Sequence, residues 1–376
     1  MGAARERIIE PEFGPTAEAQ RRVDADRRRG RGTLTNRTGR FEPVTRTEED
    51  DGWEVLAEAQ AFATEVAHET ARKIITRNSS PDLSFDRSIN PYRGCEHGCV
   101  YCFARPTHAF LGLSPGLDFE TRLTAKTNAA ELLERELAAP GYEVKTMAMG
   151  TNTDPYQPIE KRYRTTRSIL EVLERTNHPV GIVTKSALVV RDKDILARMA
   201  EQGLAKVGMS ITTLDGKLAR KMEPRAPTPM KRLEAVRELS RAGIPVTVMV
   251  APILPGLTDD GIERVLGAAY EAGAREAGYV LLRLPLEIKD LFREWLEEHY
   301  PDRVQRVFSS VRSTHAGKIY DSTWGKRQTG EGPIAWSIGR RFELAARRLG
   351  FNKERTKLRT DLFQRPALPG EQLRLF

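Results

Sequence analysis

Cysteine is nearly absent from this sequence, because its 376 residues include only Cys95, Cys99 and Cys102. Three thiols in one short stretch form an odd count and cannot staple distant segments of a chain together. We therefore expect no disulfide framework, and we expect the protein to occupy a reducing compartment. Thiols gathered in this way are instead typical of a metal site.

Long apolar runs are also lacking. No stretch approaches the roughly 20 residues that a helix needs to cross a bilayer. The amino terminus is polar and rich in arginine, without the apolar run of a secretory leader. Hydrophobic residues make up 39% of the chain and charged residues 30%, an ordinary balance for a soluble protein. The sequence therefore predicts a cytoplasmic protein with no membrane partner.

Positive charge is in excess, with a formal net charge of +8 and an isoelectric point near 9.4. A basic surface attracts polyanions, so a nucleic-acid partner stays open. Part of this charge lies in the run RRVDADRRRGRG near the amino terminus, where a solvated tail is the simpler explanation. No helix-turn-helix signature or aromatic-rich RNA motif stands out.

Four segments differ in composition and pattern. Residues 1–50 have few large apolar side chains and predict a disordered, basic tail. Residues 51–83 predict an N-terminal helix, because the stretch 53–75 is rich in helix formers with apolar residues at helical spacing. Residues 84–290 form the expected core, and residues 291–376 a helical, basic C-terminal extension.

The core alternates short apolar runs with amphipathic segments. The expected strands are RSINPYRG, VKTMAMGT, VGIVTKS, KVGMSIT, PVTVMVAPIL and AGYVLLRLPL. The expected helices are NAAELLEREL, TTRSILEVLERT, DKDILARMAEQG, MKRLEAVRELSRAG and DDGIERVLGAAYEAG. Six repeats of this kind predict an α/β fold, a partial (β/α)6 TIM-like barrel with sites at the carboxyl ends of its strands.

The run NPYRGCEHGCVYCFAR places a C-x3-C-x2-C triplet directly after the first expected strand. Three thiolates at this spacing can ligate three of the four irons of a 4Fe-4S cluster, which leaves the fourth iron open to a chelating cofactor. A structural zinc site completed by His97 or His108 is the alternative. Zinc sites usually show paired C-x2-C units, and this chain has one.

The triplet, with Tyr101 as the aromatic residue before the last cysteine, resembles the signature of the radical S-adenosylmethionine (radical SAM) superfamily. The runs NPYRGCEHGCVYC, TDPYQPIE and VTKS resemble the spore photoproduct lyase-like group, also called DNA repair photolyase-like, over residues 84–290. This resemblance implies a 4Fe-4S cluster that cleaves S-adenosylmethionine reductively to a 5′-deoxyadenosyl radical. It also implies an external one-electron donor of the flavodoxin or ferredoxin type, since no cysteine is left for a second cluster.

The same resemblance implies cofactor contacts at the ends of the strands. It places Tyr101 and Ile253 near the adenine, Ser210 near the ribose, and Lys185 with Ser186 near the methionine carboxylate. The segment MGTNTD resembles the one that binds the cofactor's amino group, which implicates Gly150, Thr151 and Asn152. Arg283 stands between leucines, and because burying an unpaired charge is costly, we expect it to face a partner or a cavity.

The chain departs from this group in one respect. Spore photoproduct lyases use a further cysteine as hydrogen donor, and this sequence has none. The resemblance therefore extends to the initiating step, with a substrate that the sequence does not identify. A nucleic-acid-binding protein with a structural or sensory iron-sulfur cluster is the second hypothesis. The polar strand ends MGTNTD, VTKS and SIT favour the enzyme, because a simple binder has no need of them.

Overall fold

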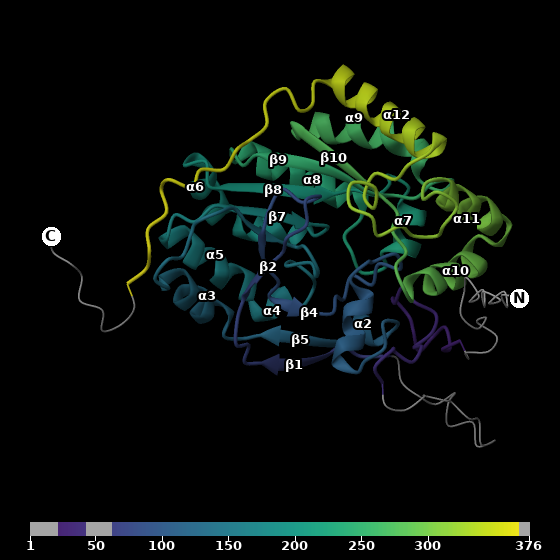
Figure 1. The fold of residues 1–376 in the computed structure, drawn as a ribbon, viewed down its shortest axis with the longest axis horizontal. Helices are drawn as coiled ribbons and strands as arrows, with labels where there is room; N and C mark the ends of the chain where they lie inside the picture. Colours follow the sequence, from purple (N-terminus) through teal and green to yellow (C-terminus); the bar gives the residue numbers. More distant parts are fainter. Residues whose placement is uncertain (1–21, 43–61, 368–376) are drawn as a thin grey trace, which may run out of the picture.

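A computed structural model of the chain describes residues 22–42 and 62–367. Its largest element is a seven-stranded sheet in the order β10-β9-β8-β7-β6-β3-β2 (Figure 1). The six strands from β3 to β10 in this sheet are parallel, and β2 pairs antiparallel with β3. Within the described residues, β2 and β10 are the two edges, so the sheet is an open, partial barrel. The bounds are β2 Ile75–Arg77, β3 Arg87–Ile89, β6 Met147–Met149, β7 Val180–Thr184, β8 Ala205–Ser210, β9 Val246–Ile253 and β10 Glu276–Leu281.

Five amphipathic helices pack their apolar faces against this sheet and share one continuous core with it. In α5, for example, Ile169, Leu170 and Leu173 recur at helical spacing and are fully buried. The strands are short apolar runs because helices cover them. The sequence therefore predicted this α/β fold correctly, and the helices are α3 Ala129–Ala138, α5 Thr165–Arg175, α6 Lys193–Glu201, α8 Pro229–Arg241 and α9 Ile262–Ala272.

A second, three-stranded sheet lies below the first in Figure 1, in the order β1-β5-β4. Its strands are β1 Glu65–Glu69, β4 Tyr92–Arg93 and β5 Arg122–Lys126. The helix expected over 53–75 is wrong from residue 62 onward, and residues 53–61 lie outside the described part. All five residues of β1 pair in parallel with β5, and this ladder outweighs a weak local preference for helix.

Residues 22–42 correct another expectation, since the tail predicted to be disordered is packed onto the body here. Val23 and Leu34 are buried, and arginines of the segment meet acidic side chains of α10 and its N-cap residue. These ion pairs are Arg22–Glu298 at 2.7 Å, Arg37–Asp290 at 3.1 Å and Arg40–Glu287 at 2.6 Å. The positive charge of residues 22–42 is thus partly neutralised within the chain. Residues 1–21 and 43–50 of the expected tail lie outside the described part.

The C-terminal region contains the helices α10 Ile288–His299, α11 Val304–Ser313 and α12 Pro333–Leu349. Helix α12 packs beside α9 and the sheet edge, where the rings of Phe342 and Tyr279 lie 4.8 Å apart (Figure 1). None of the helices among the described residues has the length and apolarity that a bilayer crossing requires. The shorter elements are η1 Arg105–Leu111, α2 Asp118–Thr121, α4 Glu160–Tyr163, η2 Ala187–Asp192, α7 Gly216–Met222, η3 Asp259–Gly261 and η4 Pro301–Arg303.

Candidate active site

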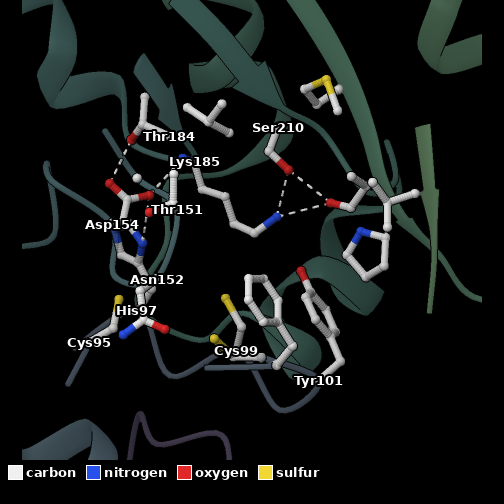
Figure 2. Close-up of a pocket in the computed structure, with 18 of the residues that line it drawn as sticks. Cys95, His97, Cys99, Tyr101, Thr151, Asn152, Asp154, Thr184, Lys185 and Ser210 are labelled. Carbon is white, nitrogen blue, oxygen red and sulfur yellow. Dashed lines mark hydrogen bonds and ion pairs between the residues drawn. The ribbon is translucent and has the colours of Figure 1, made fainter. Parts of the chain in front are cut away.

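A cavity of about 240 Å³ opens at the carboxyl ends of the parallel strands, the edge at which sites in such folds are built. The loop that carries the three cysteines forms its opposite wall, and Figure 2 shows Cys95 and Cys99 facing Lys185 and Ser210 across it. The structure brings together nine of the eleven residues predicted to hold the cluster or S-adenosylmethionine. They are Cys95, Tyr101, Cys99, Cys102, Gly150, Thr151, Asn152, Lys185 and Ser210.

Two other expected residues do not line this cavity. Ser186 is buried, and its hydroxyl accepts a hydrogen bond from Leu188 N, so it caps the short helix η2. Ile253, the last residue of β9, is fully buried in the main core. Neither residue belongs to the lining of this cavity, so the structure gives neither a contact with a ligand there.

The cysteine loop is held by its backbone and by Gln157. The amide of Cys95 donates to Phe119 O at 2.9 Å. The Gln157 side chain accepts from Glu96 N at 2.9 Å and donates to Gly94 O at 3.1 Å. Gln157 belongs to the TDPYQPIE run. Through these two hydrogen bonds, the TDPYQPIE run supports the backbone of the cysteine loop. The thiols are thereby fixed before any ligand binds.

All three thiols are strongly desolvated. Burial raises the pKa of Cys95, Cys99 and Cys102, and the Cys99 and Cys102 thiols further raise that of Cys95. Thiols in such surroundings ionise when a metal takes the proton's place. Three soft sulfur donors on one cavity wall, with polar groups opposite, fit a cluster that uses three protein ligands.

The zinc alternative finds less support in this geometry. His97 Nδ1 lies 3.4 Å from Asp154 Oδ2, and His108 Nε2 lies 3.0 Å from Arg122 O. Burial lowers the pKa of His108 to about 4, and its side chain does not line the cavity. Across the described residues, no three His, Cys, Asp or Glu side chains are placed to hold one metal ion. A cubane separates its thiolates more widely, because each of them binds a different iron.

The loop after β6 carries Gly150, Thr151 and Asn152, and Asn90 holds it in place. The Asn90 side-chain oxygen accepts from Asn152 N at 3.0 Å, and its amide nitrogen donates to the Thr151 hydroxyl at 3.3 Å. Gly150 has φ +85°, and a Cβ there would lie 1.9 Å from Val183 O. Only glycine allows the ends of β6 and β7 to approach this closely.

We predict that Gly150→Ala displaces this loop. A side chain at such a backbone position costs about 1–3 kcal/mol in free energy of unfolding, and equilibrium binding of S-adenosylmethionine to the reconstituted protein should weaken about tenfold, equivalent to about 1.4 kcal/mol. Gly216→Ala is the matched control, because nothing lies within 4 Å of a Cβ built there. Equal effects of the two substitutions on binding would show that the loop after β6 does not contact the cofactor.

Lys185 extends from the end of β7 across the cavity, as Figure 2 shows. Its ammonium donates to Ser210 Oγ at 2.7 Å and to Ala251 O at 3.1 Å, and it lies 3.5 Å from Glu223 Oε1. These contacts hold a cation at a defined point on the cavity wall. A carboxylate or other anion entering the cavity can bind it there.

Asp154 fixes the base of this lysine from the other side. Its carboxylate accepts from Thr184 Oγ1 at 2.7 Å and from Lys185 N at 2.8 Å. Although burial acts to raise the pKa of Asp154, His97 and these donors hold it below its usual value. Asp154 thereby joins the cysteine loop to the end of β7.

Sequence reasoning missed two charged residues behind the cavity wall. Glu223 accepts a hydrogen bond from the Tyr101 hydroxyl and pairs with Arg232, and all three side chains are buried. Burial acts to raise the pKa of Glu223, but Arg232 and Lys185 hold it well below its usual range. Glu223 is the only acidic residue in the run KMEPRAP at the end of α7, and no motif or spacing in that run marks it as part of a site.

Comparisons with known proteins agree with this geometry. Residues 89–269 match the Radical SAM superfamily. An uncharacterised protein of Mycobacterium tuberculosis is 41% identical over 226 residues, covering 60% of this chain and 66% of the relative. The Radical SAM Nalpha-GlyT isomerase of Pseudomonas phage M6 is 26% identical, covering 54% of this chain and 42% of the isomerase. The structure of spore photoproduct lyase complexed with dinucleoside spore photoproduct has a TM-score of 0.52 at 16% identity, covering 81% of this chain and 84% of the lyase.

The chain carries a radical SAM domain, which the match places at residues 89–269. Its fold is that of the spore photoproduct lyase structures. The matched region spans slightly less than two thirds of the mycobacterial relative's length. Radical SAM domains use an iron-sulfur cluster and S-adenosylmethionine, so the comparisons indicate an enzyme.

Proposed function

We propose that this protein cleaves S-adenosylmethionine reductively at a 4Fe-4S cluster held by Cys95, Cys99 and Cys102. The observation that carries the proposal is that these three thiols share one cavity with the polar ends of the strands. When bound, the cluster and S-adenosylmethionine supply a one-electron cleavage of a sulfonium bond that yields a 5′-deoxyadenosyl radical. Reduction requires an external one-electron donor of the flavodoxin or ferredoxin type, since the chain has no further cysteines.

The polar wall of the cavity binds and orients the cofactor in this proposal. The Lys185 ammonium takes the methionine carboxylate, and the loop of Gly150, Thr151 and Asn152 receives the amino group. Ser210 contacts the ribose, and Tyr101 lies beside the adenine. Tyr101 is held by Glu223 and by Thr212, whose hydroxyl lies 3.2 Å from the phenol oxygen, so its ring keeps one orientation without a ligand.

We further propose a nucleotide, alone or within a nucleic acid, as the substrate. One structure of similar fold supports this choice, since spore photoproduct lyase was solved in complex with a dinucleoside spore photoproduct. The excess of positive charge on the chain agrees with it. The reaction differs from that of spore photoproduct lyase, because this sequence has no fourth cysteine to act as hydrogen donor.

The proposal predicts that the protein forms 5′-deoxyadenosine from S-adenosylmethionine without any added substrate. After anaerobic reconstitution of the cluster, S-adenosylmethionine and dithionite should give 5′-deoxyadenosine and methionine, quantified by liquid chromatography. A sample without reductant is the control. A fully loaded cluster that gives no 5′-deoxyadenosine would reject the enzyme and favour a nucleic-acid-binding protein with a structural or sensory cluster.

A further inference from the structure

We propose that Arg283 binds an oxyanion of the substrate, a phosphate or a carboxylate, at the Cys102 side of the cavity. Arg283 lies just after β10 and lines the cavity together with Cys102 and Phe103. The inference rests on the proposed function, because it assigns Arg283 to the substrate and Lys185 to the cofactor.

Arg283 lacks the counterion that the buried cations near it have. Lys185 and Arg232 share Glu223, and Arg105 pairs with Glu120. Within the described part of the chain, Arg283 forms no ion pair, and its guanidinium carbon lies 4.3 Å from the centre of the Phe103 ring. Burial lowers the pKa of Arg283, which agrees with a cation that has lost water without gaining an acid partner.

The cavity therefore presents two separate cations. The Lys185 ammonium is fixed at the ends of β8 and β9 by Ser210 and Ala251. The Arg283 guanidinium lies over Phe103, on the wall that carries Cys102. S-adenosylmethionine has a single carboxylate, which one of these two cations can bind, and the other cation can then bind a second anion. That anion belongs to the molecule that enters the cavity after the cofactor.

The Phe103 ring positions the Arg283 guanidinium for contact with an oxyanion. Its side chain is 44% exposed, which is unusual for a phenylalanine next to a cavity. A guanidinium over an aromatic ring is held by cation–π attraction, while the N–H groups at its edge stay free to donate. Such a planar edge matches two oxygens of a phosphate or carboxylate. Lysine offers only a point charge there, so we expect arginine to bind the oxyanion more tightly.

The test is isothermal titration of the reconstituted protein saturated with S-adenosylmethionine. The probes are inorganic phosphate, acetate, thymidine 5′-phosphate and thymidine. We expect at least one anionic probe to bind and Arg283→Gln to weaken it about tenfold, as for a lost charge-assisted contact. Arg283→Lys should lie between the wild type and Arg283→Gln, and thymidine should respond to neither variant. A preference for phosphates over acetate assigns a phosphate-bearing substrate, and the reverse preference assigns a carboxylate substrate.

Arg237→Gln is the matched control, because Arg237 is exposed on α8 on the outside of the sheet. Anion binding equal in wild type and Arg283→Gln, or absent from the wild type, overturns the inference. A tenfold weaker affinity of Arg283→Gln for S-adenosylmethionine itself also overturns it, because Arg283 would then hold the methionine carboxylate. The proposed function is judged separately, by 5′-deoxyadenosine formed without any of these probes.

Discussion

Cys99→Ala is expected to abolish both the cluster and the formation of 5′-deoxyadenosine. With two protein ligands left, Cys95 and Cys102, a cluster that needs three thiolates cannot be held. Cys99 shares a buried apolar cluster with Val100 and Met222, both of which are fully buried. Iron and sulfide content, together with the visible absorption of the reconstituted protein, should fall to the level of an unreconstituted sample.

Met222→Leu is the matched control for this loss. Met222 is fully buried in the same core cluster as Cys99, and its carbonyl accepts from Val100 N at 3.0 Å. Exchange of Met for Leu conserves volume and usually costs less than about 1.5 kcal/mol. We expect the variant to keep its cluster and its product. A Cys99→Ala protein that retained the cluster's absorption would contradict the ligand assignment.

The sequence was sufficient to predict the fold of the core. Each strand from β6 to β10 corresponds to one apolar run, and each covering helix has apolar residues at helical spacing. These signals are local, so they can be read without knowing the partner of each element. The position of the cavity followed from the same pattern, because parallel strands all end at the same edge of the sheet.

The elements that were missed depend on partners far away in the sequence. Residues 65–69 have helix-forming composition, and they become a strand only because β5 offers them a ladder. In the sequence, Arg37 has the local context of a solvated tail. In the structure it lies 3.1 Å from Asp290, a residue more than 250 positions later in the chain. Glu223 likewise gains its role from Tyr101 and Arg232. Such pairings leave no periodicity in the sequence, and their local context favours the simpler interpretation.

The same kind of long-range pairing supports the backbone of the cysteine loop on the side away from the cavity. Arg105 is fully buried and donates to Cys99 O at 2.9 Å, to Gly116 O at 3.0 Å and to Glu120 Oε1 at 2.6 Å. Glu120 also accepts from Gly32 N at 2.8 Å. One carboxylate therefore joins the amino-terminal segment to the arginine that holds the loop's backbone. The position of the thiols depends on a charge pair that does not reach the cavity.

Glu120→Ala is therefore expected to lower the stability of the fold strongly, although Glu120 lies outside the cavity. It leaves Arg105 buried without a counterion, and breaking a buried pair on one side costs about 3–5 kcal/mol. It also leaves the amide of Gly32 without its acceptor. Urea unfolding, followed by circular dichroism, should show this loss in the free energy of unfolding, and cluster loading should fall because Arg105 no longer fixes Cys99.

Glu131→Ala on α3 provides the comparison. The Glu131 side chain is 73% exposed, and its pair with Arg135 at 3.9 Å is a surface contact within one helix. Removing it should change the free energy of unfolding by no more than about 0.5 kcal/mol. If Glu120→Ala cost as little as Glu131→Ala, water would have to reach Arg105, and the cysteine loop would not depend on this buried pair. If instead stability fell and cluster loading did not, Glu120 would stabilise the fold without positioning the thiols.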